Sequence, residues 1–258
     1  MKHEGKIFKT KKYGDLIVTN YIKCNEVSVR FISTGYETTV EMGDIRKGNV
    51  RDRLFPNVYG VGIVGEEPTR IDGVVLKEYM FWVNMLTRCL SDKYQDKQPT
   101  YKGCTFSENF KYYPYFKEWC SNQIGFGNEG WHLDKDILVK GNKVYSEDTC
   151  VFVPREINNL LALNKSNRGE YLLGVCYSKQ HNKFAAQLNK FGKRVKLGVF
   201  NTEQEAFNVY KKAKERYTKE VAEKWKDQID PRVYDALMTY VVEMKEHDII
   251  VEQLIDNT

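Results

Sequence analysis

The sequence is poor in histidine and proline and contains no long apolar run. Of its 258 residues, four are His and six are Pro, which with 18 Gly excludes collagen-like and proline-rich linker proteins. No stretch reaches the roughly 18 apolar residues that a membrane-spanning helix needs. The first residues, MKHEGKIFKTKKYG, lack the apolar core of a signal peptide. We therefore expect a cytoplasmic protein with no membrane partner.

Cysteine is equally sparse. The six Cys are scattered and none belongs to a C-x-x-C pair, so we expect reduced thiols rather than a disulfide framework. Four of them fall in the centre of the chain: Cys89, Cys104, Cys120 and Cys150. Because these four lack paired spacing, they are interpreted as small buried apolar side chains rather than as a zinc site.

The sequence does contain enough apolar residues for packed cores, and its charge is unevenly distributed. An apolar fraction of 41% with 13% aromatic residues excludes a mostly disordered chain.

The net charge of +5 averages two segments of opposite charge. Residues 171–200 hold six Lys or Arg and no acid, whereas residues 227–258 hold eight acids and two bases. The basic segment is either a polyanion-binding face or a solvated surface that lacks acids.

The N-terminal part has the pattern of short β-strands. Leu16–Val18, alternating apolar residues over Val27–Phe31, and Thr38–Val40 are separated by turn residues. These strands predict a small β-barrel or a curled sheet as a domain over residues 1–68, with a boundary at the glycines before Pro68.

The centre of the chain changes to helical and aromatic segments. Apolar spacing predicts a helix over Tyr79–Leu90, and Phe110–Cys120 is a second short segment that Pro114 is expected to interrupt. Ser146 is predicted to cap a short helix, and residues 164–169 have the small polar composition of a linker.

Residues 171–200 predict three antiparallel strands, at 171–177, 183–189 and 194–200. Thr202 and Glu205 form a capping box that opens a helix, and Pro231 begins a last helix. Alternation places Phe184, Ala186 and Leu188 under the first helix, with Val195, Leu197 and Val199 also together on one face. The opposite face then carries hydrogen-bond donors that suit phosphates and base edges: Lys183, Gln187, Asn189, Arg194 and Lys196.

This segment resembles the Apetala-type DNA-binding domain of plant ethylene-response factors, which also occurs in phage and mobile-element endonucleases. Matching residues include Gly174-Val175, Lys183–Ala186, Leu197-Gly198-x-Phe200 and Thr202. The resemblance implies that the sheet enters the major groove of double-stranded DNA. It implies these DNA-binding residues: Tyr177, Lys179, Lys183, Gln187, Lys193, Arg194 and Lys196. Lys196 stands where the plant domains often have Trp, and Cys176 where they have Arg, so no plant target sequence is inferred.

The central part resembles phage proteins described as HNH endonucleases. The resemblance is carried by Trp82-x-x-Met85, Phe116-x-x-Trp119, Leu133–Asp136 and Tyr145-Ser146-x-x-x-Cys150. Such enzymes use a β-hairpin and a helix to hold one divalent metal, Mg²⁺ or another, at the scissile phosphate.

Carried over residue by residue, the HNH resemblance makes Asp134 and Asp136 the metal ligands. It places Lys135 at the catalytic histidine and Thr149 at the helical Asn. Lysine is a poor proton acceptor at neutral pH, so His132, on the same strand face as Asp134, is the substitute base. The alternative interpretation is an ordinary histidine beside hydrogen-bonded hairpin carboxylates.

Together these patterns predict an α+β, multidomain chain. Its parts are a small β-barrel (1–68), an HNH-like ββα-metal endonuclease domain (75–165), an Apetala-type domain (170–226) and an acidic C-terminal helix (227–258). The first functional hypothesis is a metal-dependent DNA endonuclease of the phage, homing type, acting in the host bacterial cytoplasm. The alternative is a catalytically inactive HNH-like DNA-binding protein, a regulator or antagonist of host DNA transactions. A third class is an RNA-binding module, because aromatics beside basic strands can stack unpaired bases.

Overall fold

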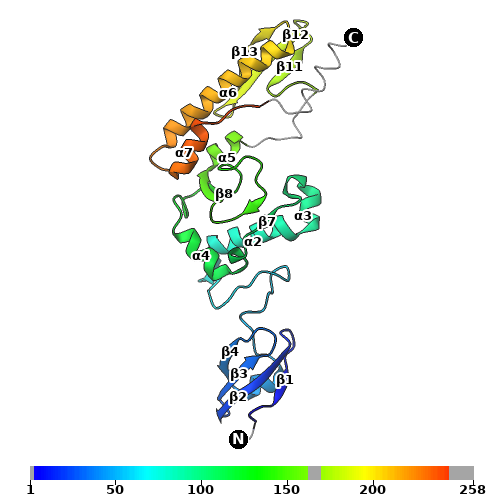
Figure 1. Cartoon of the computed structure of the whole chain (residues 1–258), viewed down its shortest axis with the longest axis vertical. Helices are drawn as coiled ribbons and strands as arrows, with labels where there is room; N and C mark the ends of the chain where they lie inside the picture. Colours follow the sequence, from blue (N-terminus) through cyan, green and yellow to red (C-terminus); the bar gives the residue numbers. More distant parts are fainter. Residues whose placement is uncertain (1–2, 162–169, 244–258) are drawn as a thin grey trace. The chain divides into compact units, whose positions relative to one another are not determined.

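The computed structural model describes residues 3–161 and 170–243 and shows a mixed α+β chain with several small sheets (Figure 1). The predicted linker at 164–169 and the end of the acidic tail lie outside the described residues. Two compact units are present. One takes the chain up to Asn122 together with Lys143–Asp148, and the other takes Gln123–Asn142 and the described residues from Thr149 onwards. No described helix combines the length and the apolar character that a membrane crossing requires.

The first unit begins with a four-stranded antiparallel sheet in chain order. Its elements are β1 (Ile7–Lys9), β2 (Asp15–Lys23), β3 (Glu26–Phe31), β4 (Glu37–Val40) and the following helix α1 (Met42–Lys47). The predicted closed barrel is wrong, because β1 and β4 do not pair and the sheet stays open. Edge strands of three and four residues are too short to close four strands into a barrel. Instead, Met42, Ile45 and Val50 cover the buried face of the sheet.

The rest of the first unit is built around two helices rich in aromatic residues. Its elements are β5 (Arg70–Ile71), β6 (Val74–Val75), α2 (Lys77–Leu90), α3 (Asp92–Lys97), η1 (Pro99–Tyr101), β7 (Thr105–Phe106), η2 (Asn109–Lys111), α4 (Tyr113–Ser121) and β9 (Val144–Tyr145). Buried Trp82 donates its indole N–H to the carbonyl oxygen of Phe110 at 2.8 Å. Pro114 lies in the first turn of α4, where a missing N–H costs nothing, so it starts the helix and does not interrupt it.

The second unit joins a strand pair to the predicted three-stranded module. Its elements are β8 (Trp131–Asp134), β10 (Val151–Pro154), α5 (Arg155–Leu161), β11 (Val175–Ser178), β12 (Lys183–Lys190), β13 (Lys193–Phe200), α6 (Glu203–Trp225) and α7 (Pro231–Met238). The second and third predicted strands and the capping box of Thr202 and Glu205 are confirmed, whereas the first strand begins at Val175 and not at Tyr171. α6 lies along one face of the β11–β12–β13 sheet (Figure 1).

One hydrophobic core holds the second unit together. Val151 and Val153 of β10 and Ile157 of α5 belong to the same buried cluster as Leu188 of β12 and Phe207 of α6. The predicted helix at Ser146 is wrong: the residues after β9 form a turn, and the helix α5 begins only after β10.

Candidate nucleic-acid interface and the Asp134 loop

The pairing register of the three-stranded sheet decides which side chains share a face. Gln187 is opposite Lys196 and Asn189 is opposite Arg194, so these four side chains lie together on the face away from α6. The amide of Gln187 lies 3.3 Å from the Sγ of Cys176 across β11 and β12, which places Cys176 on this face as well. We call this side the outer face, formed by Cys176, Ser178, Lys183, Ala185, Gln187, Asn189, Arg194, Lys196 and Val199.

The cations of the outer face are exposed and lack acidic partners. In the part of the chain that the structure describes, no ion pair involves Lys183, Arg194 or Lys196. Lys190, on the opposite face, shows the contrast: it pairs with Glu220 of α6 and lies over the ring of Tyr217. The outer face is therefore a patch of uncompensated positive charge with amide groups between the cations.

A β-bulge changes the alternation that the sequence predicts for β13. The register passes from Ala186 opposite Gly198 to Gln187 opposite Lys196, so Leu197 is an extra residue. The bulge turns Val199 to the outer face, where it is 46% exposed, and the prediction that it lies with Val195 is wrong. A single sequence gives no sign of a bulge apart from the glycine beside it.

The seven predicted DNA-binding residues fall in three places. Lys183, Gln187, Arg194 and Lys196 lie on the outer face, and Lys179 lies in the exposed turn between β11 and β12. Tyr177 and Lys193 lie on the α6 side of the sheet, opposite Phe184 and Lys190 respectively. The Tyr177 ring packs against Phe184, and its hydroxyl donates to the side chain of Asn182.

The second predicted site lies in the loop that follows β8. Asp134 ends the strand, and its Oδ1 accepts hydrogen bonds from the backbone N–H groups of Asp136 at 2.9 Å and Ile137 at 2.8 Å. Burial raises the pKa of the Asp134 carboxyl, and the charge of Asp136 raises it further, against the opposing effect of the two N–H bonds. The carboxylate thus shapes the turn at the start of the loop.

Lys135 is buried and fixes the loop at its other end. Its side chain is 8% exposed, and its Nζ donates to the carbonyl oxygen of Asn142 at 2.9 Å and lies 3.4 Å from Oδ2 of Asp136. Asn142 returns a bond: its Nδ2 donates to the carbonyl oxygen of Lys135 at 2.6 Å. The residue pattern around Asn142 indicates only a Gly-Asn turn and does not predict this exchange.

The structure places His132 on β8 and Thr149 outside any helix. His132 is exposed on β8, two residues before Asp134 and opposite Val153 of β10. Thr149 lies in the turn before β10, so its predicted helical position is wrong. The amides on the helix after β10 belong to Asn158 and Asn159, which were not among the predicted site residues.

The donors around Asp134 do not fit a resident divalent cation. No cluster of three or more His, Cys, Asp or Glu that could hold a metal occurs in residues 3–161 or 170–243. One Asp134 oxygen is already engaged by two backbone N–H groups, and the Asp136 carboxylate lies beside the Lys135 ammonium. An ammonium in this position competes with a metal for the same carboxylate, so we derive no hydrolytic step here.

The fold and these two sites define an α+β protein with a basic sheet face and a carboxylate loop. Comparison of the chain with protein-family models, with curated proteins and with solved structures finds no match. The Apetala-type and HNH resemblances therefore stay predictions, and the functional argument depends on the geometry of the two sites.

Proposed function

We propose that this protein binds double-stranded DNA through the outer face of the β11–β12–β13 sheet. The observation that carries the proposal is the absence of any acidic partner for Lys183, Arg194 and Lys196 within the described residues. Exposed cations without protein partners are free to replace the counterions of a phosphate backbone, the main source of affinity for nucleic acid.

The distribution of groups over two strands favours a duplex. β12 and β13 carry all three cations, and the major groove of B-form DNA admits a two-stranded β-ribbon. Gln187 and Asn189 lie between the cations, and the amide side chains of these residue types can bond base edges. The RNA-binding hypothesis is weaker, because it depends on aromatic rings that stack unpaired bases and none of the residues of the outer face is aromatic.

The order of elements around Asp134 favours a second candidate, the metal-dependent endonuclease. β8 pairs with β10 and α5 follows β10, which are the two strands and the helix that the HNH resemblance implies, with β9 lying between β8 and β10 in the chain. Against it, Lys135 replaces the expected base and is held inside the loop by Asn142. We therefore rank the non-catalytic DNA-binding protein first and treat the Asp134 loop as a structural part of it.

One experiment separates the two candidates. Purified protein and an Asp134→Asn variant are incubated with labelled duplex DNA in Mg²⁺, in Mn²⁺ and in EDTA, and binding and cleavage are both measured. We expect the two proteins to bind the duplex equally, with an affinity that falls as salt rises, and to leave it intact. Cleavage that EDTA and the substitution both abolish would establish the endonuclease instead. Failure to bind duplex at low salt would refute both.

A further inference from the structure

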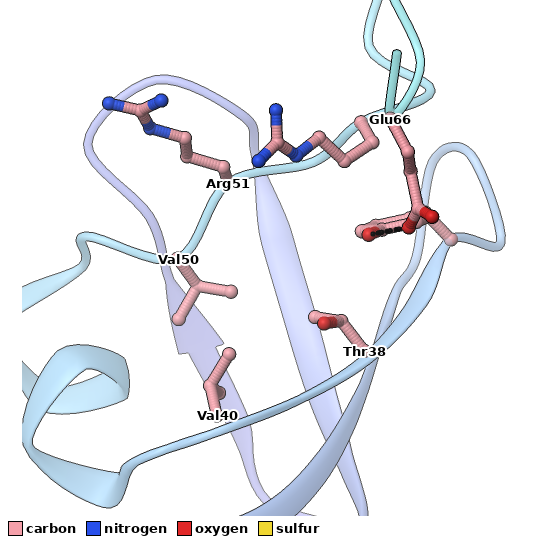
Figure 2. A pocket seen from close by; sticks show the side chains of 7 residues that line it. Thr38, Val40, Val50, Arg51 and Glu66 are labelled. Atoms are coloured by element: carbon pink, nitrogen blue, oxygen red, sulfur yellow. Dashed lines mark hydrogen bonds between the residues drawn. The ribbon is translucent and has the colours of Figure 1, made fainter. Parts of the chain in front are cut away.

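A pocket in the first unit has not been used by the sites described above. It has a volume of about 400 Å³ and lies between β4 and the chain that follows α1. Its walls are formed by Tyr36, Thr38, Val40, Val50, Arg51, Arg53 and Glu66. Figure 2 shows Arg51 on one side of the space, with Val40 and Val50 below it and Glu66 across from it. The volume falls in the lower part of the range of small-molecule sites.

Two arginines line this pocket, and the residue between them anchors the backbone that carries them. Asp52 is 3% exposed and accepts hydrogen bonds from the Thr34 hydroxyl at 2.6 Å and from the backbone N–H of Leu54 at 2.8 Å. Arg51 and Arg53 flank this anchored carboxylate, are exposed, and have no ion pair with any described acid. Two guanidinium groups carried on one anchored segment are suited to contacts with phosphate oxygens.

The remaining walls are suited to a flat group that carries hydrogen-bonding edges. Val40 and Val50 offer an apolar floor, and Thr38 adds a hydroxyl beside it (Figure 2). On the far side the Tyr36 hydroxyl donates to Oε1 of Glu66 at 2.8 Å, which fixes the Glu66 carboxylate next to an aromatic ring. A second carboxylate oxygen of Glu66 can accept a bond from a ligand N–H or O–H.

We propose that this pocket binds one unpaired nucleotide, with its phosphate on Arg51 and Arg53 and its base over the valines and Tyr36. Glu66 disfavours a ligand that is only an anion, because it places a negative charge opposite the two arginines. A duplex keeps its bases stacked and paired, so it cannot insert a base here without opening. The nucleotide is supplied either free in solution or by a single-stranded nucleic acid, since both carry the same phosphate and base. This site is independent of the outer face and does not rest on the function proposed above.

The test uses the full chain with Arg194→Ala and Lys196→Ala already in place, so that the outer face does not contribute. AMP, CMP, a single-stranded oligonucleotide and inorganic phosphate are titrated by calorimetry into this protein. The same ligands are titrated into the protein with Arg51→Gln and Arg53→Gln added. A matched control carries Arg30→Gln and Arg46→Gln, which remove two exposed arginines of the same unit outside the pocket.

We expect saturable binding that the Arg51 and Arg53 changes weaken at least tenfold and the control changes leave intact. Binding of the mononucleotides supports the free ligand, and binding of the oligonucleotide alone supports the strand-borne one. Three results would overturn the proposal. They are no binding of the mononucleotides or the oligonucleotide, binding that the Arg51 and Arg53 changes leave unaffected, and inorganic phosphate binding as tightly as a nucleotide.

Discussion

Lys135 and Asn142 hold each other at the two ends of one loop. The Nζ of Lys135 donates to the carbonyl oxygen of Asn142 at 2.9 Å, and the Nδ2 of Asn142 donates to the carbonyl oxygen of Lys135 at 2.6 Å. Each side chain thereby satisfies the other residue's backbone, and the buried ammonium gains a partner in place of water. The loop after β8 is closed by this exchange.

Asn142→Ala is expected to destabilise the protein by about 1–3 kcal/mol, because it leaves the carbonyl oxygen of Lys135 without the Asn142 side chain as donor. Urea unfolding of the variant measures the change. Val139→Ala, at an exposed position of the same loop, serves as the control and should stay within about 0.5 kcal/mol of the parent protein. Equal effects of the two substitutions would show that the exchange between Lys135 and Asn142 contributes nothing.

Asp134→Asn is expected to make stability less dependent on acid pH. Because the pKa of Asp134 is raised in the fold above its ordinary 3.8, the native protein holds this proton more tightly than the unfolded chain does. The stability that this bound proton contributes to the fold is full below pH 3.8 and is lost as pH rises through the native pKa. Asparagine can accept the same two N–H bonds without a charge.

The Asp134→Asn variant should therefore gain stability relative to the parent protein on going from below pH 3.8 to neutral pH. Urea unfolding at the two pH values measures this difference. A relative loss at neutral pH would mean that the ionised carboxylate is favoured in the fold.

Lys214 should give stability the opposite pH dependence under alkaline conditions. Burial lowers the pKa of its ammonium from 10.5 to about 8, while its Nζ donates to the carbonyl oxygen of Leu160 at 2.6 Å. Between these pH values the unfolded chain binds the proton and the native protein does not, so native stability rises with pH. From about pH 8 to pH 10.5, the free energy of unfolding of the parent protein should rise by on the order of 2 kcal/mol relative to that of Lys214→Met. Parallel stability curves for the two proteins would contradict the lowered pKa.

Gly174 is expected to tolerate no side chain because of Tyr210 on α6. A Cβ on Gly174 would lie 2.1 Å from the Tyr210 ring, and the residue also has φ +79°. Gly192 has a similar φ of +74° but open space around it. Gly192→Ala should therefore cost about 1–2 kcal/mol for its backbone alone, and Gly174→Ala about 1–3 kcal/mol more for the overlap. Thermal unfolding of both variants checks this order, and equal costs would contradict it.

The parts of the fold that the sequence predicted are those set by local pattern. Alternation in β12, the capping box of Thr202 and Glu205, and the first-turn Pro231 each depend on neighbouring residues, and the structure confirms all three. The predicted helix at 79–90 is confirmed as α2 for the same reason, since Trp82, Met85, Leu86 and Cys89 form its buried side.

The parts that failed depend on contacts between distant residues. Whether β1 pairs with β4 depends on strand length and on the covering helix α1, so alternation alone could not exclude a barrel. The bulge at Leu197 depends on how β12 and β13 pair, and it moves Val199 to the outer face of the sheet. The role of Asn142 depends on its distance from Lys135, seven residues away, which only the folded loop reveals.

The most direct test of the central claim is the salt dependence of duplex binding. Arg194→Ala combined with Lys196→Ala should lower affinity for a labelled duplex and make the slope of log affinity against log salt about 2 units shallower. A matched control, Lys212→Ala with Lys219→Ala, removes two exposed lysines of α6 and should leave both quantities unchanged. An unchanged affinity and slope in the outer-face variant, or an equal loss in the control, would contradict DNA binding by this sheet.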